Sequence, residues 1–277
     1  NLPGYGPGRG SSGRGGGYGG ASGGADTNYG WTYGSMTAPL QAGSGGAGGN
    51  GIGGYGGGLV RIEATNVLVN GFIRANGGAG SVYEGGGSGG GVTIQCRTFA
   101  GTNGTVQANG GSTYYNHQTP SGGGGGRIAV AYDLAAQDAL PRPSITFSAG
   151  GGHSVQKPCG DVGTLYFPDS RFLLDPRYAT ETITHSGEWR APGLAALSVT
   201  NLTLTNAWMR FPADGFPVSV TNGIAIYGSN PKLYRLELTG GTVRCGGDLL
   251  LTNAWLMLKR GDTGTAGLQC GGSFGLL

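Results

Sequence analysis

A five-residue motif occurs twice in the C-terminal part of the chain, and it restricts the fold more than any other feature. Leu-Thr-Asn-Ala-Trp ends at Trp208 and again at Trp255, an offset of 255 − 208 = 47. A repeat made of a strand and a turn cannot bury its apolar side alone, so it must stack on neighbouring repeats. The duplication therefore predicts a solenoid built from strands.

The same region also shows a shorter period. Ser198-Val-Thr-Asn returns as Ser219-Val-Thr-Asn at an offset of 219 − 198 = 21, and Val243-Arg-Cys-Gly-Gly returns as Leu268-Gln-Cys-Gly-Gly at an offset of 268 − 243 = 25. Apolar residues alternate within each unit. A spacing of this size is typical of a parallel β-helix, in which each coil supplies two or three short strands and like side chains stack along the axis.

Asparagine recurs at two places in these units, where the chain would turn a corner. Asn201 and Asn222 share one corner, and Asn206 and Asn253 share another. We expect left-handed backbone at such corners, because asparagine tolerates it. The two tryptophans are expected to bury the largest areas, on the order of 200 Å² each.

The N-terminal half repeats with a longer unit. Strand-like runs begin near residues 60, 92, 128 and 165, and glycine-rich stretches follow at 77–91, 110–126 and 150–163. Of the 64 glycines, 48 lie in residues 1–160. Residues 1–58 lack comparable runs and are either a flexible linker or a bundle of extended glycine strands. We favour the bundle, because only close packing would offset the entropy that glycine loses on ordering.

These patterns predict an all-β protein. It is expected to be a right-handed parallel β-helix with long glycine-rich insertions packed as a polyglycine-II-like bundle. The expected divisions are a glycine-rich segment at 1–58, coils with glycine-rich excursions at 59–169, a connecting segment at 170–197, and, at 198–277, coils that follow the shorter period.

Several function classes are disfavoured by composition. The net charge of +3 is spread along the chain without a basic block, which argues against nucleic-acid binding. No run of 18 apolar residues predicts a membrane span. The 14 acidic residues are scattered, and His117, His153 and His185 lack acidic partners at a recognisable spacing, so we expect no enzyme. No Cys-x-x-Cys pair occurs, and we expect no metal and no cofactor.

Cysteines and glycosylation motifs are the remaining candidate sites. Cys96, Cys159, Cys245 and Cys270 allow two disulfides in three pairings. Cys245 and Cys270 both precede Gly-Gly, so they are expected on adjacent coils, either as a disulfide or as buried apolar side chains. Asn103 and Asn201 fit the N-glycosylation pattern.

The glycine-rich units contain Gly-Gly-Gly-Leu-Val-Arg-Ile, Ala-Asn-Gly-Gly and Gly-Gly-Gly-Gly-Gly-Arg-Ile-Ala-Val. This pattern resembles the glycine-rich repeat regions of very large surface proteins from planctomycete and verrucomicrobial bacteria. The Leu-Thr-Asn-Ala-Trp coils resemble the β-helical segments that flank such regions. The resemblance implies secretion and a structural or adhesive role, and it brings no catalytic residues. Because the sequence starts without Met and stops in a coil-like segment, we expect it to be cut from a longer polypeptide.

The expected function is that of a secreted structural protein, a subunit of an extracellular or cell-surface filament. Copies would assemble head to tail through open β-helix ends. The expected contact residues are Leu268, Phe274, Leu276 and Leu277 on one side and Tyr5, Tyr18 and Trp31 on the other. The alternative is a monomeric adhesin or glycan-binding module whose aromatic-bearing glycine loops contact glycans or surfaces. An ice-ordering protein would need a longer threonine array than this sequence has.

Overall fold

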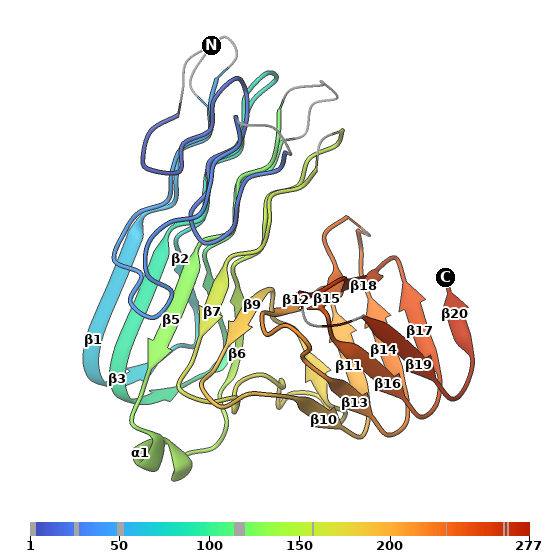
Figure 1. Ribbon diagram of the computed structural model, residues 1–277. Helices are drawn as coiled ribbons and strands as arrows, with labels where there is room; N and C mark the ends of the chain where they lie inside the picture. The colour runs from blue at the N-terminus through green and yellow to red at the C-terminus, as the bar shows by residue number, and fades with distance from the viewer. Residues whose placement is uncertain are drawn as a thin grey trace. The chain divides into compact units, whose positions relative to one another are not determined.

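The regular secondary structure of the described residues is almost entirely parallel β-strands arranged in stacked sheets (Figure 1). The computed structural model describes residues 4–24, 28–48, 53–113, 120–156, 158–230, 232–262, 264 and 266–277. The chain divides into two compact units. The first comprises Asn1–Pro141 and Ile145–Pro168, and the second comprises Arg142–Ser144 and Asp169–Leu277. This architecture is consistent with the predicted β-solenoid.

The first unit contains two parallel sheets. One has the order β1 (Leu59–Leu68), β3 (Gly91–Ala100), β5 (Arg127–Ala131) and β7 (Thr164–Tyr166). The other has the order β2 (Phe72–Arg74), β4 (Thr102–Gln107) and β6 (Ser144–Ser148). The four strands of the first sheet begin within one residue of the positions that the longer sequence period predicts.

The two sheets of this unit bury side chains against each other. In-register pairing places Val60 on Val92, Val92 on Ile128 and Ile128 on Leu165. Phe147 of β6 contacts Phe99 of β3, with ring centroids 6.1 Å apart. The single helix of the described residues, α1 (Leu134–Asp138), adds Gln137, whose buried amide bonds to both backbone groups of Phe99.

The glycine-rich segments of the first unit lie side by side and hydrogen-bond to one another through their backbones (Figure 1). The Gly16 N–H donates to Gly86 O at 2.9 Å, and the Gly123 N–H donates to Gly111 O at 2.9 Å. The Gly152 N–H donates to Gly123 O at 2.8 Å. A Cβ atom built on Gly123 would lie 2.1 Å from Gly87 O, so this spacing admits no side chain. These contacts favour the ordered bundle over a flexible linker.

The second unit is built from three parallel sheets, and successive repeats each add one strand to every sheet. The first is β9 (Gly187–Arg190), β12 (Trp208–Phe211), β15 (Arg235–Thr239) and β18 (Trp255–Lys259). The second is β10 (Leu197–Val199), β13 (Val218–Val220), β16 (Thr242–Cys245) and β19 (Gly267–Cys270). The third is β8 (Thr182–Ile183), β11 (Leu202–Thr205), β14 (Ile224–Tyr227), β17 (Leu249–Thr252) and β20 (Phe274–Leu276).

The register of these sheets places apolar residues on apolar residues. Leu204 pairs with Ile226, Ile226 with Leu251, and Leu251 with Leu276. The first three are buried, each with an exposed fraction of 6% or less. Burial of each such side chain contributes roughly 1.5–3 kcal/mol. These columns are the core of the unit.

The corner asparagines follow the prediction at one position and depart from it at the other. Asn206 and Asn253 both have φ of 47°, as expected. Asn201 and Asn222 are not left-handed. Their corner is held by hydrogen bonds between coils, since the Asn222 N–H donates to Thr200 O at 2.8 Å. The expected burial of the two tryptophans also holds for only one of them, because Trp208 is 2% exposed and Trp255, on the last strand of its sheet, is 46% exposed.

Residues 170–197, expected to be a connecting segment, belong to the second unit and are packed. The buried carboxylate of Asp175 accepts hydrogen bonds from Arg177 Nε at 2.9 Å and Thr184 Oγ1 at 2.8 Å. The His185 ring stacks on Trp189 with centroids 5.6 Å apart. Its Nε2 lies 2.7 Å from Phe172 O and carries the proton of that bond, because a carbonyl only accepts. Burial lowers the pKa of His185 to about 4.

Replacing Gly123 with alanine should destabilise the first unit by about 2 kcal/mol or more, because the new methyl group meets Gly87 O. Urea unfolding monitored by tyrosine fluorescence measures the change. Gly58→Ala is the matched control, since a Cβ there meets nothing within 4 Å. Equal stability of the two variants would contradict close glycine packing.

The stability of the second unit should fall as the pH drops from 6.5 to about 4. Unfolded His185 binds a proton at its ordinary pKa of 6.5 and the buried ring only at about 4, so the neutral ring stabilises the fold above this window. The full loss is about 3 kcal/mol. Urea midpoints measured by tryptophan fluorescence at several pH values test this. His185→Gln, which cannot titrate, should flatten the profile between pH 6.5 and 5, and an unchanged slope would refute the assignment.

Candidate functional site

Strand edges at the last coil of the second unit face no neighbouring strand among the described residues. β18, β19 and β20 pair on one side only, with β15, β16 and β17. In the first unit, β1 and β2 likewise pair only with β3 and β4 within the described part of the chain. Unpaired N–H and C=O groups on a strand edge form a template for another strand.

Core positions of the last coil are exposed. Leu268 continues the Val218–Val243 column, and Phe274 and Leu276 continue the columns through Leu249 and Leu251. Their exposed fractions are 43%, 53% and 67%, and that of Leu277 is 78%. A hollow of about 490 Å³ opens here, lined by Leu251, Asn253, Ala254, Trp255, Leu256, Leu276 and Leu277. All four C-terminal residues predicted for the contact are thus exposed on the last coil, and we call the exposed side of this coil the end face.

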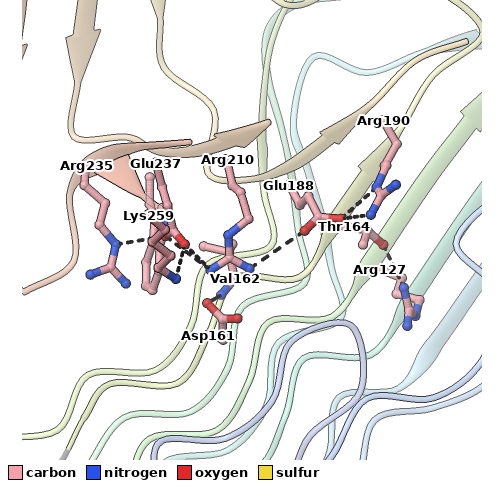
Figure 2. A network of polar contacts seen from close by, with 11 residues as sticks. Arg127, Asp161, Val162, Thr164, Glu188, Arg190, Arg210, Arg235, Glu237 and Lys259 are labelled. Carbon is pink, nitrogen blue, oxygen red and sulfur yellow. Dashed lines mark hydrogen bonds and ion pairs between the residues drawn. The ribbon is translucent and has the colours of Figure 1, made fainter. Parts of the chain in front are cut away.

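Charged residues alternate along the first sheet of the second unit. The register pairs Arg210 with Glu188 on one side and with Glu237 on the other. Arg210 Nη2 lies 3.0 Å from Glu237 Oε1, and Arg210 Nη1 lies 3.8 Å from Glu188 Oε2 (Figure 2). The column is therefore acid, base, acid from one coil to the next.

Glu237 is the centre of this network. Its side chain is 1% exposed, and it also meets Arg235 Nε at 3.4 Å and Lys259 Nζ (Figure 2). The Trp208 indole Nε1–H donates to its Oε2 at 3.0 Å. Burial acts to raise the pKa of Glu237, but the charge of Arg210 and the hydrogen bond from Lys259 outweigh it, so the pKa is lowered. The carboxylate therefore favours its ionised form and is the shared anion in contact with three cations.

A second column combines aromatic rings with a cation. Trp208 pairs with Arg235, and Arg235 pairs with Trp255. The Arg235 guanidinium carbon lies 3.4 Å from the centroid of the Trp208 ring, a close cation–π contact. Trp255 completes the column at the edge of the sheet, where its ring is half exposed. The sheet edge therefore ends in a tryptophan that is about half exposed.

The β1 edge carries complementary chemistry. Val60 and Ile62 face the core side, because their partners Val92 and Ile94 are fully buried. Arg61 and Glu63 lie on the opposite face and form an exposed ion pair. The strand thus presents apolar residues on one face and a cation and an anion on the other.

The three N-terminal aromatic residues predicted for the contact lie in different environments. Tyr5 and Trp31 are 77% and 57% exposed. Tyr18 is fully buried, packs on Tyr33 at 4.7 Å between ring centroids, and lies under the Arg127 guanidinium at 5.4 Å. Since its surface is already covered within its own unit, Tyr18 is removed from the set of contact residues.

The cysteines and glycosylation motifs are only partly brought together. Cys245 and Cys270 are Cα partners on β16 and β19, as the repeat predicts, and both are thiols. Cys96 and Cys159 are partly exposed in the first unit. Asn103 is exposed with φ of 58°, and Asn201 is partly exposed. Glycosylation of either asparagine stays a prediction.

The charged network was missed by the sequence reasoning, which treated the acids as scattered. Its signal is the alternation of charged and apolar residues in Glu188-Trp-Arg190, Trp208-Met-Arg210-Phe and Arg235-Leu-Glu237-Leu. Only the strand register shows that these short runs lie on each other. The three histidines do not form a cluster in the described residues: His185 is buried, the His153 backbone N–H bonds to Ser112 Oγ, and His117 lies outside the described part.

The described residues contain neither a metal-ligand cluster nor a membrane-spanning helix. No three His, Cys, Asp or Glu side chains there converge as metal ligands would. None of the described helical residues forms a segment with the length and hydropathy needed to cross a lipid bilayer.

Replacing Glu237 with glutamine should destabilise the second unit by about 3 kcal/mol, because it removes the buried charge that Arg210, Arg235 and Lys259 share. Tryptophan fluorescence during urea unfolding measures this. Asp262→Asn, at an exposed acid of the same unit, should cost less than about 1 kcal/mol. A neutral effect of Glu237→Gln would show that the network does not stabilise the coil stack.

Comparison with known proteins identifies no relative. No protein-family model, no curated protein and no solved structure matches the chain.

Proposed function

We propose that the protein is a secreted structural subunit that assembles head to tail into an extracellular or cell-surface filament. One observation carries this proposal: among the described residues, two strand edges lack a neighbouring strand, one at β1 and one at the end face. Both edges carry exposed apolar residues. Joining two different surfaces of identical copies is a heterologous contact, which extends without closing. Secretion rests on the resemblance to bacterial surface proteins.

The strand register supports a specific contact between copies. Leu256 and Leu258 of β18 continue the buried column positions of Leu236 and Leu238. A β1 strand of a second copy added in parallel must place Val60 and Ile62 on that same side, since a one-residue slip would turn them outward. The registers that meet this condition differ from one another by multiples of two residues.

One of these registers extends the column of Trp208, Arg235 and Trp255 and brings an acid near Lys259. With Ile62 opposite Leu256, Arg61 of the added copy lies opposite Trp255 and continues the alternation of Trp208, Arg235 and Trp255. Glu63 then lies opposite Met257 and diagonal to Lys259, whose side chain is half exposed. Complementary charge of this kind selects register and partner more than it adds affinity.

The arrangement of the coils and of the glycine segments suits a protein that bears mechanical load. We propose that the coils close into a right-handed parallel β-helix and that the glycine segments form a polyglycine-II-like bundle. Extended segments that hydrogen-bond to several neighbours support the second assignment, as with Gly123, which accepts from Gly152 and donates to Gly111. Such packing leaves few rotatable side chains and favours a stiff element.

The environment of Glu237, the acid with the most charged neighbours, is compatible with a non-enzymatic role. Glu237 is buried, ionised and surrounded by three cations and an indole, so it is a poor proton donor and has no open access to a substrate. We propose that the charged network around Glu237 stabilises the stacked coils of the second unit. We include no cofactor in the proposal.

The second candidate is a monomeric adhesin or glycan-binding module. Exposed aromatic rings in the glycine-rich unit favour it, because Tyr5, Trp31 and Tyr55 are 77%, 57% and 78% exposed. Flat aromatic faces suit sugar rings. The two candidates differ in what the purified protein forms by itself, fibres or single particles.

Replacing Leu276 with lysine should abolish filaments, because it places a charge at a core position of the end face. Negative-stain microscopy and sedimentation velocity measure assembly. Tyr227→Lys is the control, since it changes an exposed aromatic residue of β14, whose two neighbouring strands are both present. Single particles of the wild-type chain at all concentrations would support the adhesin instead.

Mixing experiments test the polarity of the contact. Ile62→Lys blocks the β1 edge, and Leu276→Lys blocks the end face, so neither variant alone should form more than a monomer. An equimolar mixture should form heterodimers and stop there, because one good surface of each kind remains. Filaments in the mixture, or dimers of either variant alone, would contradict a head-to-tail contact.

A further inference from the structure

Two thiols lie next to each other at the end of the coil stack. Cys245 on β16 and Cys270 on β19 are Cα partners in a parallel pair. Their Sγ atoms lie 3.4 Å and 3.1 Å from the same oxygen, the carbonyl of Gly247. Cys245 is 3% exposed, and Cys270 is partly exposed. The two sulfurs therefore converge on one point of the corner, and one of them is accessible.

Cysteine occupies this position in only two of the four paired strands β10, β13, β16 and β19. The equivalent positions on the preceding strands are Val199 and Val220, which pair in the same register. A small apolar side chain is thus sufficient at this corner. The change to cysteine in two adjacent coils adds sulfur chemistry that packing does not require.

The spacing suits a covalent bond. Paired residues on adjacent parallel strands lie about 4.8 Å apart, and disulfides span Cα–Cα distances of about 4.4–6.8 Å. Both side chains leave their strands on the same side of the sheet, because residues paired in register share a face. Closing the bond requires both side chains to leave the Gly247 carbonyl and the two Cβ atoms to approach to about 3.5–4.5 Å.

We propose that Cys245 and Cys270 are a redox pair that closes to a disulfide and staples the last two coils together in an oxidising environment. The oxidant is a low-molecular-weight disulfide, written RSSR. The disulfide forms within one chain, so it does not need the filament contact in order to close, although Cys270 lies on the edge strand β19.

The reaction takes place in two exchange steps. The accessible Cys270 thiolate attacks RSSR, forming Cys270–S–S–R and releasing RS⁻. Cys245 loses its proton to solvent and its thiolate attacks Cys270 Sγ, forming the Cys245–Cys270 disulfide and releasing a second RS⁻. The two cysteine sulfurs are oxidised by two electrons in total, and RSSR is reduced to two thiols. Burial raises the pKa of Cys245, so the second step should speed up as the pH rises.

The disulfide should restrict local opening of the last two coils. It closes a loop that runs from Cys245 to Cys270 and contains β17 and β18. Cross-linking restricts the opened states of such a loop. Proteolytic cleavage within residues 246–269 should slow by about tenfold or more on oxidation.

Oxidised glutathione is the probe for the full 277-residue chain, with intact-mass and peptide mass spectrometry as readouts. The expected product has lost two hydrogens, with the peptides containing Cys245 and Cys270 linked. Cys245→Ser should trap a stable glutathione adduct on Cys270, since the resolving thiol is gone. Cys96→Ser, whose thiol sits against Ala131 O in the other unit, should leave the cross-link unchanged.

Two results would overturn the proposal. One is a wild-type chain that keeps glutathione on Cys270 without forming the cross-link. The other is a Cys245→Ser chain that shows no adduct on Cys270. Circular dichroism of each variant confirms that the serine substitution leaves the strands folded, so that loss of reactivity is separated from loss of structure.

Discussion

In-register parallel stacking is the constraint on which the rest of this structure depends. When each coil lies directly on the previous one, every side chain meets its counterpart one coil away, and the sequence must make each such meeting favourable. Leu204, Ile226, Leu251 and Leu276 satisfy it by apolar contact. Glu188, Arg210 and Glu237 satisfy it by alternating charge. Identical charges in such a column would repel, which explains why the charged positions alternate while the apolar ones repeat.

The two units meet this constraint in different ways. The second unit fills its coils with side chains, and each column is a run of matched groups. In the first unit, glycine-rich segments remove the side chains, so that backbones approach until Gly123 has no room for a methyl group. The entropy lost by ordering glycine is offset by backbone hydrogen bonds made to several neighbours at once. Strand β5 begins at Arg127, directly after Gly122–Gly126, where side chains return.

The sequence predicts the features that repeat and misses those that depend on register. The strand starts, the coil period and the stacking of Cys245 on Cys270 follow from spacing. Spacing also predicts left-handed backbone at Asn206 and Asn253, but it predicts the same wrongly at Asn201 and Asn222. The exposed half of Trp255 could not be foreseen from its motif, because its environment depends on what covers the strand. Tyr18 looked like a surface residue among glycines, yet glycine backbones are what allow Arg127 and Tyr33 to close over it. The network around Glu237 combines residues from four strands that no local window contains.

The columns of stacked side chains also explain why a strand edge in this fold restricts which strand can pair with it. An edge of an ordinary sheet offers hydrogen bonds to any strand, whereas the β18 edge presents Trp255, Met257 and Lys259 on one face and Leu256 and Leu258 on the other. A strand that joins it must match apolar side to apolar side and place suitable partners on the ring and the ammonium group. Backbone pairing supplies most of the affinity in such additions, and the side chains select the register. In the proposed filament, the choice of register would therefore follow from the same rule that orders the coils, that each coil must match the one beneath it.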